Sequence, residues 1–430
     1  MPDYQDRVLD RELDELLSSL PAVSVEGPKG VGKSATTERR AGTIFRLDSP
    51  AHRALAEADP GVLLAAAPPV LLDEWQHVPA IWDAVRRAVD ADHSPNRFLL
   101  ARSASPVAPP THSGAGRIVT ARMRPLALSE RGLGGPTVSL EKLLQGKHPK
   151  VAGRTTFGLT EYVQEIIASG FPGLRHLKGR ALRAQLDGYL QRIVDRDFPE
   201  QNQTVRRPDL LRRWLAAYAA ATATTTTFEK IRATSSAGDG DAPAKTTSNS
   251  YRSVLEQLWI VDPVPGWVPS RNHLLRLTQA PKHHLADPAL AARLLGASED
   301  ALLTGSADNV NARAKGAMPR DGALLGQLFE SLVTLSVRVY AQSAEARVRH
   351  LRTREGREEI DLIVERADHR VVAIEVKLSA TVTDNDVRHL LWLREKLGGD
   401  VLDMMVITTG DTAYRRLDGV AVVPAVLLGP

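Results

Sequence analysis

A glycine-rich stretch near the start of the chain, residues 23–34, places the tightest constraint on the fold. It holds Gly27, Pro28, Lys29, Gly30, Val31, Gly32, Lys33 and Ser34, a full match to the pattern G-x-x-x-x-G-K-[ST]. The β-prone run Ala22–Val25 precedes it, and Ala35–Arg40 is suited to open a helix. Strand, glycine turn and helix is the order that surrounds a phosphate with backbone N–H groups. The stretch therefore predicts a phosphate-binding loop.

Each residue of such a loop has an expected role toward ATP. The Lys33 ammonium would reach the β- and γ-phosphates, and the Ser34 hydroxyl would ligate Mg²⁺. The remaining residues expected to contact the cofactor are Gly27, Pro28, Lys29, Gly30, Val31, Gly32 and Ala35. The alternative is an ordinary glycine-rich turn without a ligand. A second motif argues against this alternative.

That second motif is Pro69–Glu74, an apolar run that ends in two acids. An apolar run of this kind is typical of a buried parallel strand, and α/β sheets bind ligands at the carboxyl ends of such strands. Asp73 would hold Mg²⁺, and Glu74 would orient and deprotonate the attacking water. Adjacent acids are also common on surfaces, but their position after a phosphate loop favours a Walker B motif and ATP hydrolysis.

Composition excludes several other classes of protein. The chain has 430 residues, enough for two or three domains, and its 43% hydrophobic and 25% charged content is typical of globular proteins. It has no cysteine, which excludes disulfides, thiolate zinc sites and cysteine nucleophiles. The absence of an apolar run of about eighteen residues and of a signal-peptide pattern predicts a cytoplasmic protein without a membrane partner. The net charge of +4 favours an anionic partner only weakly.

Two further polar residues are candidates for the catalytic site. Ser103 follows the strand-like run Arg97–Ala101, where ATPases of this architecture carry a residue that senses the γ-phosphate; the alternative is a serine that caps a turn. Arg117 follows a glycine-containing loop and is a candidate finger for the nucleotide of a neighbouring subunit. It would make the active form a homo-oligomer, for example a ring, although a lone arginine is more often simply solvated.

Five segments together resemble one known family. They read G-P-K-G-V-G-K-S, L-L-D-E, S-A-S, S-G-A-G-R-I and M-R-P-L-A-L-S-E. The resemblance is to prokaryotic AAA-type ATPases that carry a C-terminal domain of unknown function, and it is most specific over residues 1–135. The family pattern has Thr-Gly-Ser where this chain has Ala101, Arg102 and Ser103. Tyr189, Ile193 and residues 195–197 also match a family segment, to which no role can be assigned from the sequence.

The middle of the chain, residues 151–300, predicts helices followed by a winged helix. Helical patterns cover Tyr162–Ala168, Ala181–Phe198, Leu210–Ala221 and Lys245–Leu258, and a hairpin is expected through Pro263–Leu277. In DNA-binding winged helices the second helix enters the major groove. Residues of suitable chemistry there are Lys245, Thr246, Thr247, Asn249, Tyr251 and Arg252. The alternative is a spacer or dimerisation module that does not contact DNA.

Residues 321–430 carry a second constellation of charges. Asp361 lies on an apolar strand pattern, and Glu375 and Lys377 share one face of the next strand because strand side chains alternate. With the helical Glu330 upstream, this order resembles the PD-(D/E)xK nuclease core. The resemblance implies that Glu330, Asp361 and Glu375 ligate Mg²⁺ or Mn²⁺ and that Lys377 positions or activates water. The domain could instead bind DNA or a protein partner without cutting.

The sequence thus predicts an α/β multidomain protein with three parts. They are a P-loop AAA-type ATPase core (1–135), a helical and winged-helix middle (151–300) and a restriction-endonuclease-like end (321–430). The expected cofactors are ATP and Mg²⁺, with Mn²⁺ as an option at the C-terminal site. The leading hypothesis is an ATPase that moves or remodels DNA, with optional metal-dependent cleavage. The alternative is a nucleotide-switched oligomeric binding module whose nuclease-like domain is catalytically inactive.

Overall fold

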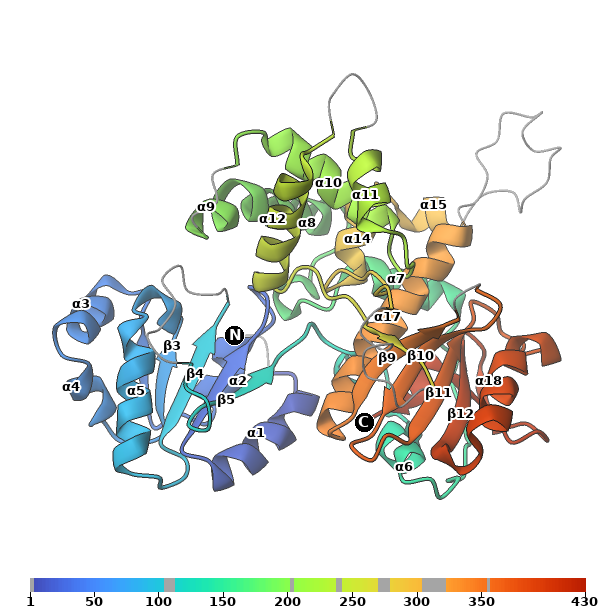
Figure 1. Cartoon of the computed structure of the whole chain (residues 1–430), viewed down its shortest axis with the longest axis horizontal. Coiled ribbons are helices and arrows are strands. Elements are labelled where there is room, and N and C mark those ends of the chain that lie inside the picture. The colour runs from blue at the N-terminus through green and yellow to red at the C-terminus, as the bar shows by residue number, and fades with distance from the viewer. Residues whose placement is uncertain are drawn as a thin grey trace.

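The computed structural model shows three lobes, which follow one another in the chain (Figure 1). It describes residues 4–103, 113–201, 205–236, 242–269, 279–303, 322–353 and 356–430. An α/β lobe comes first, a helical lobe second, and a lobe built around a mixed sheet last. The predicted class, an α/β multidomain protein with a helical middle, is confirmed.

The first lobe is a sheet of parallel strands in the order β2-β3-β4-β1-β5. The strands are β1 (Ala22–Glu26), β2 (Thr43–Arg46), β3 (Val70–Asp73), β4 (Phe98–Arg102) and β5 (Val119–Arg122). Residues of β1 and β3 are all buried, which suits the continuous apolar runs seen in their sequences. Because β4 lies between β1 and β3, the ends of these three strands form one row at the same edge of the sheet.

Helices cover both faces of this sheet. They are α1 (Val8–Ser19), α2 (Lys33–Glu38), α3 (Pro50–Ala58), α4 (Pro60–Leu64) and α5 (Ala80–Ala91). Helix α1 packs by an apolar stripe, since Leu9, Leu13 and Leu17 recur at helical spacing and are buried. The stripe of α5 likewise buries Trp82, Val85 and Val89.

The second lobe is helical, as predicted. Its helices are α7 (Leu159–Ala168), α8 (Gly179–Arg192), a π-helical turn η4 (Ile193–Asp197), α9 (Phe198–Glu200), α10 (Pro208–Ala220), α11 (Phe228–Thr234), α12 (Lys245–Gln257), α14 (Pro288–Leu294) and α15 (Glu299–Leu303). Between α12 and α14, Val261 pairs with Leu285 and Val264 with Lys282 as antiparallel bridges. Residues 270–277 of the predicted hairpin lie outside the described residues.

One predicted DNA contact on α12 is largely buried, and its role toward DNA stays a prediction. Tyr251 is only 8% exposed, because its ring packs against Phe198 and Trp214, with centroids 6.0 and 6.3 Å away. The guanidinium of Arg252 is half-buried and lies over the ring of Phe228, 4.4 Å from its centroid. The other predicted contacts, Lys245, Thr246, Thr247 and Asn249, remain on the exposed or half-exposed face of the helix.

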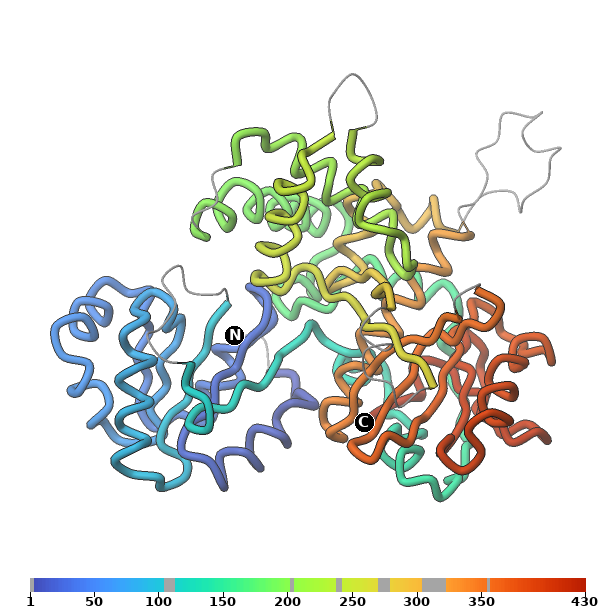
Figure 2. Tube along the Cα trace, viewed as in Figure 1, coloured from blue at the N-terminus to red at the C-terminus, as the bar shows by residue number. Residues whose placement is uncertain are grey.

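The third lobe is a mixed sheet in the order β7-β13-β14-β12-β11-β10-β9-β8. Its strands are β7 (Gly153–Arg154), β8 (Gly266–Trp267), β9 (Arg347–Arg352), β10 (Glu359–Glu365), β11 (Val371–Val376), β12 (Val401–Thr408), β13 (Thr412–Arg415) and β14 (Ala421–Pro424). Helix α18 (Asp384–Leu397) packs on it. Both outer strands, β7 and β8, come from outside the predicted range 321–430. In Figure 2 the yellow segment after α12 leaves the helical lobe and runs alongside β9.

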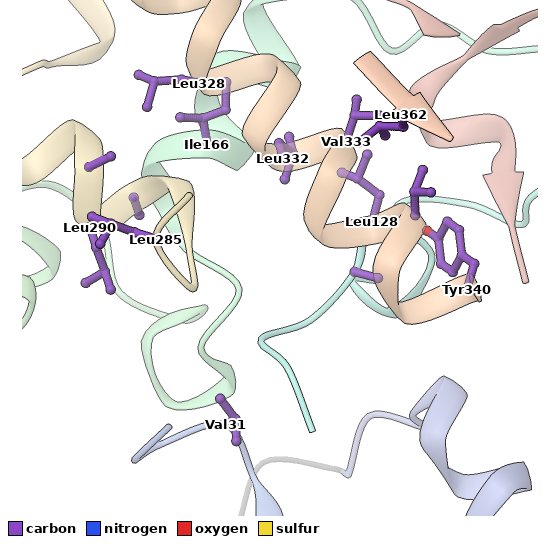
Figure 3. Close-up of a cluster of buried hydrophobic side chains, with 14 of the residues drawn as sticks. Val31, Leu128, Ile166, Leu285, Leu290, Leu328, Leu332, Val333, Tyr340 and Leu362 are labelled. Atoms are coloured by element: carbon purple, nitrogen blue, oxygen red, sulfur yellow. The ribbon is translucent and has the colours of Figure 1, made fainter. Parts of the chain in front are cut away.

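Helix α17 (Gly322–Ser343) is the element on which all three lobes pack. It is the one helix among the described residues that is long and apolar enough to cross a membrane. Most of it is buried inside the protein, so its apolar character is explained by the core. Figure 3 shows part of the buried core around α17. Leu328, Leu332, Val333 and Tyr340 of α17 are labelled there with Leu128, Ile166, Leu285, Leu290 and Leu362 from other elements, and Val31 lies farther from the helix.

A buried aspartate joins the first lobe to the other two. The Asp262 carboxylate lies 3.2 Å from the guanidinium of Arg122, 3.0 Å from that of Arg124 and 2.8 Å from that of Arg338 on α17. Its side chain is 7% exposed, and the three positive charges hold the pKa of Asp262 far below its usual range despite burial. The carboxylate therefore compensates several arginines that are themselves mostly buried.

Replacing Asp262 by Ala should strongly destabilise the protein, because it leaves several buried guanidinium groups without a counter-charge. We expect a loss of about 3–5 kcal/mol, the range observed when one partner of a buried pair is removed. Urea denaturation followed by tryptophan fluorescence measures it. The matched control is Asp195→Ala, whose carboxylate is 41% exposed and pairs with Arg212; it should change stability by less than about 1 kcal/mol. Equal midpoints for the two variants would contradict the role given to Asp262.

Candidate functional site

The predicted phosphate-binding loop connects β1 to α2 and adopts a conformation that requires glycine. Gly30 and Gly32 have φ angles of 84° and 99°, in the left-handed region. A Cβ on Gly27 would lie 2.1 Å from the Met123 carbonyl oxygen, so only glycine fits there. The buried Val31 side chain points into the core, which leaves the backbone of the loop facing outward. The sequence pattern and the geometry therefore agree.

The Lys33 side chain lies along the inside of this loop. Its ammonium donates to the carbonyl oxygens of Gly27 and Pro28, each at 2.9 Å. The residue is 4% exposed, and burial lowers the pKa of its ammonium to about 8, although the charges of Glu74 and Asp73 oppose that shift. Hydrogen bonds to backbone carbonyls thus hold the Lys33 ammonium at a position from which it can contact a phosphate.

Asp73 ends β3 directly beside the loop. Burial raises the pKa of its carboxyl to about 6, while a hydrogen bond from Ser34 and the charge of Lys33 act in the opposite direction. A hydroxyl and a carboxylate in contact supply the hard oxygen ligands that Mg²⁺ prefers. Ser34 and Asp73 therefore fit a Mg²⁺ ion that accompanies a nucleotide.

Glu74 and Ser103 come together at the same edge of the sheet. The Ser103 hydroxyl lies 2.7 Å and 3.1 Å from the two carboxylate oxygens of Glu74, and the Gln76 amide donates to the same carboxylate. Glu74 itself has a φ of 53°, an uncommon conformation for a residue with a side chain. Arg102, which departs from the family pattern, turns away and pairs with Glu26 at 2.6 Å. The arginine therefore leaves Ser103 beside Glu74.

Glu74 and Ser103 line a cavity of about 770 Å³ together with residues of the phosphate loop, and its size is within the usual range of small-molecule sites. The loop residues are Lys29, Gly30, Gly32, Lys33, Ser34 and Ala35. The cavity also has a wall that the sequence analysis did not predict. Its additional residues are Asp48, Arg53 and His77 of the first lobe, and Pro172, Gly173, Tyr189, Arg192, Arg196, Asp197 and Glu200 of the helical lobe. The only sequence signal for this wall was the family segment at residues 189–197, which could not be assigned a role without the fold.

Lys29 links the phosphate loop to that second wall. Its ammonium lies 2.7 Å from the Asp197 carboxylate and 3.0 Å from that of Glu200. The Tyr189 hydroxyl donates to the Lys29 carbonyl oxygen at 3.1 Å. Asp197 closes the π-helical turn η4, a form that is rare and frequent at functional sites. The loop is therefore bonded to the helical lobe at a residue expected to contact the cofactor.

Arg117 does not line this cavity. Its guanidinium pairs with Asp90 of the same chain at 2.7 Å, and its side chain is 46% exposed. Its role as a finger toward a neighbouring subunit, and the homo-oligomer that role implies, stay predictions.

The predicted C-terminal constellation also comes together, on β10, β11 and α17. Asp361 and Glu375 are neighbours, and the negative charge of Asp361 adds to burial in raising the pKa of Glu375. Lys377 pairs with Glu375 at 2.9 Å. Burial and Asp361 raise the pKa of Glu330 to about 8. An unpredicted residue, Lys282 of the helical lobe, lies among these acids, at 2.8 Å from Glu330 and 3.1 Å from Asp361.

Comparison with known families assigns the three parts of the chain separately. Residues 19–131 match the family described as AAA domain. Residues 159–301 and 325–428 match families described as domains of unknown function, DUF8612 and DUF4143. The first part of the chain is thus an AAA domain with a P-loop. The predicted combination with a C-terminal domain of unknown function is confirmed, whereas the nuclease-like nature of that domain stays a prediction.

Individual proteins similar to this chain are distant. The uncharacterized proteins Rv2008c of Mycobacterium tuberculosis and Mb2031c of Mycobacterium bovis are each 25% identical over 294 residues, which is 66% of this chain and 58% of theirs. The chain thus matches less than two thirds of their length. A solved structure of the Aeropyrum pernix ORC2 protein, in ADPNP–ADP complexes, has a TM-score of 0.30 at 15% identity and covers 69% of this chain and 93% of that one.

The lowered pKa of Lys33 predicts that ATP affinity falls in alkaline solution. In the free protein the ammonium loses its proton above about pH 8, whereas a bound phosphate favours the protonated form, so binding above that pH must take up a proton. We expect a constant Kd between neutral pH and pH 8 and a rise of up to about tenfold per pH unit beyond. Fluorescence titration with a labelled ATP analogue measures it. Lys33→Ala should bind weakly at every pH, and a wild-type Kd that stays flat to high pH would contradict the assignment.

Proposed function

We propose that this protein is an ATPase whose nucleotide cycle changes how the helical lobe packs on the AAA domain, and that it acts on DNA. The observation that carries the proposal is the cavity of about 770 Å³ that unites the phosphate loop, Glu74 and Ser103 with residues of the helical lobe. A nucleotide in this cavity would contact both lobes. Its binding and loss would therefore change the energy of their interface.

The residues of the first wall support hydrolysis as the reaction. Lys33 would exchange the carbonyls of Gly27 and Pro28 for phosphate oxygens. Mg²⁺, when held by Ser34 and Asp73, would neutralise phosphate charge. The Glu74 carboxylate would accept the proton of the attacking water; its two oxygens offer about four lone-pair directions, more than Ser103 and Gln76 use.

The second wall supports coupling of that reaction to movement. Phosphate oxygens arriving at the loop would compete with Asp197 and Glu200 for the Lys29 ammonium. Loss of those ion pairs would free α9 and η4, while Arg192 and Arg196 of the same wall could in turn bind the phosphates. Nucleotide binding would thus replace one set of contacts between the lobes by another.

Replacing Glu74 by Gln should stop turnover and preserve ATP binding. The amide keeps the shape and a hydrogen bond of the side chain but cannot accept the water proton, so kcat should fall by about 10²–10⁴-fold. Phosphate release measures turnover, and equilibrium titration with ATP measures binding. The matched control is Glu57→Gln, an exposed glutamate on α3 that does not line the cavity and should leave kcat unchanged. Wild-type turnover by the Glu74 variant would exclude the Walker B assignment.

DNA is the partner that a specific surface favours. The exposed Arg206 and Arg207, which precede α10, border a groove of about 540 Å³ together with Thr246, Thr247 and Ser250 of α12. Lys245 and Asn249 extend the polar face of α12. Arginine and hydroxyl side chains on an exposed face are suited to phosphate contacts. This face of the helical lobe is therefore the proposed DNA-binding surface.

Replacing Arg206 and Arg207 together by Ala should weaken DNA binding and make it less dependent on salt. Two lost phosphate contacts should reduce the slope of log K against log salt by about 2. Fluorescence anisotropy with duplex, single-stranded, forked and four-way DNA measures it. The control is Arg212→Ala, an exposed arginine on α10 whose guanidinium already pairs with Asp195 and Asp209.

An unchanged salt slope in the double variant would exclude this surface. The same DNA substrates also separate the two forms of the proposal. Strong stimulation of ATP hydrolysis by one of them would favour an enzyme that moves or remodels DNA. Turnover that is indifferent to all of them would favour a nucleotide-switched binding module.

A further inference from the structure

The ammonium group of Lys282 lies inside the C-terminal carboxylate cluster. The residue is 1% exposed, although it belongs to the segment between α12 and α14 of the helical lobe. Its backbone is fixed by two hydrogen bonds to Val264, of 2.9 and 2.8 Å. Strand β8 begins two residues after Val264 and pairs with β9. Lys282, which is bonded to Val264, is therefore anchored at the border of the third lobe. The position of the Lys282 side chain is therefore fixed by the fold, unlike that of a surface lysine.

Three carboxylates surround this ammonium. It donates to Glu330 at 2.8 Å and to Asp361 at 3.1 Å, and Glu359 lies 3.7 Å away. An ammonium has three N–H donors, so the two bonds and the third carboxylate nearly exhaust its capacity. The distances are those of charged hydrogen bonds, whereas a divalent ion binds oxygen at about 2.0–2.6 Å. Lys282 thus stands where the sequence placed Mg²⁺ or Mn²⁺ between Glu330 and Asp361.

Of the remaining oxygens on Asp361 and Glu375, one is left without an N–H or O–H donor. The other oxygen of Asp361 accepts from the Val376 N–H at 2.9 Å, and one oxygen of Glu375 accepts from Lys377 at 2.9 Å. The second oxygen of Glu375 has no N–H donor within hydrogen-bond distance; the ring Nδ1 of His389 lies 3.8 Å away, and the Asp361 carboxyl adjoins the Glu375 carboxyl. Over the residues that the structure describes, no group of three or more His, Asp or Glu side chains is arranged to hold a metal ion. The predicted ligands Glu330, Asp361 and Glu375 therefore do not fit a divalent ion.

We propose that the Lys282 ammonium is the resident cation of this cluster and takes the place of a divalent metal. The cluster then serves as an internal ion-pair site that fastens the segment after α12 to β10 and α17. It does not cut DNA by a metal-dependent route. Removal of the lysine charge would leave several buried carboxylates facing one another, and a divalent ion would become the best available counter-charge.

Counting bound Mn²⁺ on the full chain by electron paramagnetic resonance tests the proposal. All proteins carry Asp73→Asn and are free of nucleotide, so the phosphate-loop site contributes equally to each. With Lys282 intact, adding Asp361→Asn should leave the amount of bound Mn²⁺ unchanged. Lys282→Met, of similar length but neutral, should bind one additional Mn²⁺ per chain and gain several degrees in Tm when Mn²⁺ is added. Adding Asp361→Asn to Lys282→Met should remove both effects.

Two results would overturn the proposal. The first is a Lys282-containing protein that binds Mn²⁺ and loses it on Asp361→Asn or on Glu375→Gln; this comparison needs no lysine variant. The second is a folded Lys282→Met protein, checked by circular dichroism, that binds no additional Mn²⁺. A residues 321–430 fragment is unsuitable for the experiment, because it lacks both Lys282 and β8.

Discussion

The buried ion pair between Arg7 and Glu130 stabilises the conformation of the phosphate loop. The two side chains are each 3% exposed and 3.1 Å apart. Arg7 also donates to the carbonyl of Val31 in the phosphate loop and to that of Arg124, while Glu130 accepts from the backbone N–H of Val8 and Ala127. Backbone groups next to Glu130 bond to Ser336 and Tyr340 of α17. Each member of the pair also bonds to backbone groups, which compensates for the burial of the two charges. The shape of the loop thus depends on a contact with the long central helix.

Local patterns predicted the parts of the site that one short stretch can specify. The phosphate loop, Asp73 and Glu74 each depend on a strand and the turn that follows it, so their roles could be predicted from neighbouring residues. Ser103 was found for the same reason, because the end of β4 lies beside the end of β3. Lys282, Arg192 and Asp197 were missed because their positions depend on how distant segments pack. The burial of Tyr251 was missed for a related reason, since a helical pattern does not reveal which face meets Phe198 and Trp214. The family segment M-R-P-L-A-L-S-E, whose role was not evident from sequence, ends in the Glu130 of the buried pair.

The segment between α12 and α14 is bonded to both ends of the molecule. Asp262 at its start pairs with arginines of the AAA domain, and Lys282 near its end pairs with acids of the C-terminal sheet. Arg338 of α17 completes the first group and Glu330 of the same helix completes the second. A shift of the helical lobe during a nucleotide cycle would therefore act on two buried charge clusters rather than on a flexible linker.

The outer strands of the C-terminal sheet have a consequence for how the molecule is made. Strand β7, at residues 153–154, pairs with β13 near the other end of the chain, and β8 pairs with β9 across a long stretch of intervening sequence. Pairings between residues so far apart close large loops and fold slowly. During synthesis β7 and β8 would have no pairing partner until β13 and β9 had been made. In that period their unpaired edges would be prone to association with other chains. The three family segments are separate along the sequence, yet the third does not complete its own sheet, because β8 of the second segment forms an outer strand.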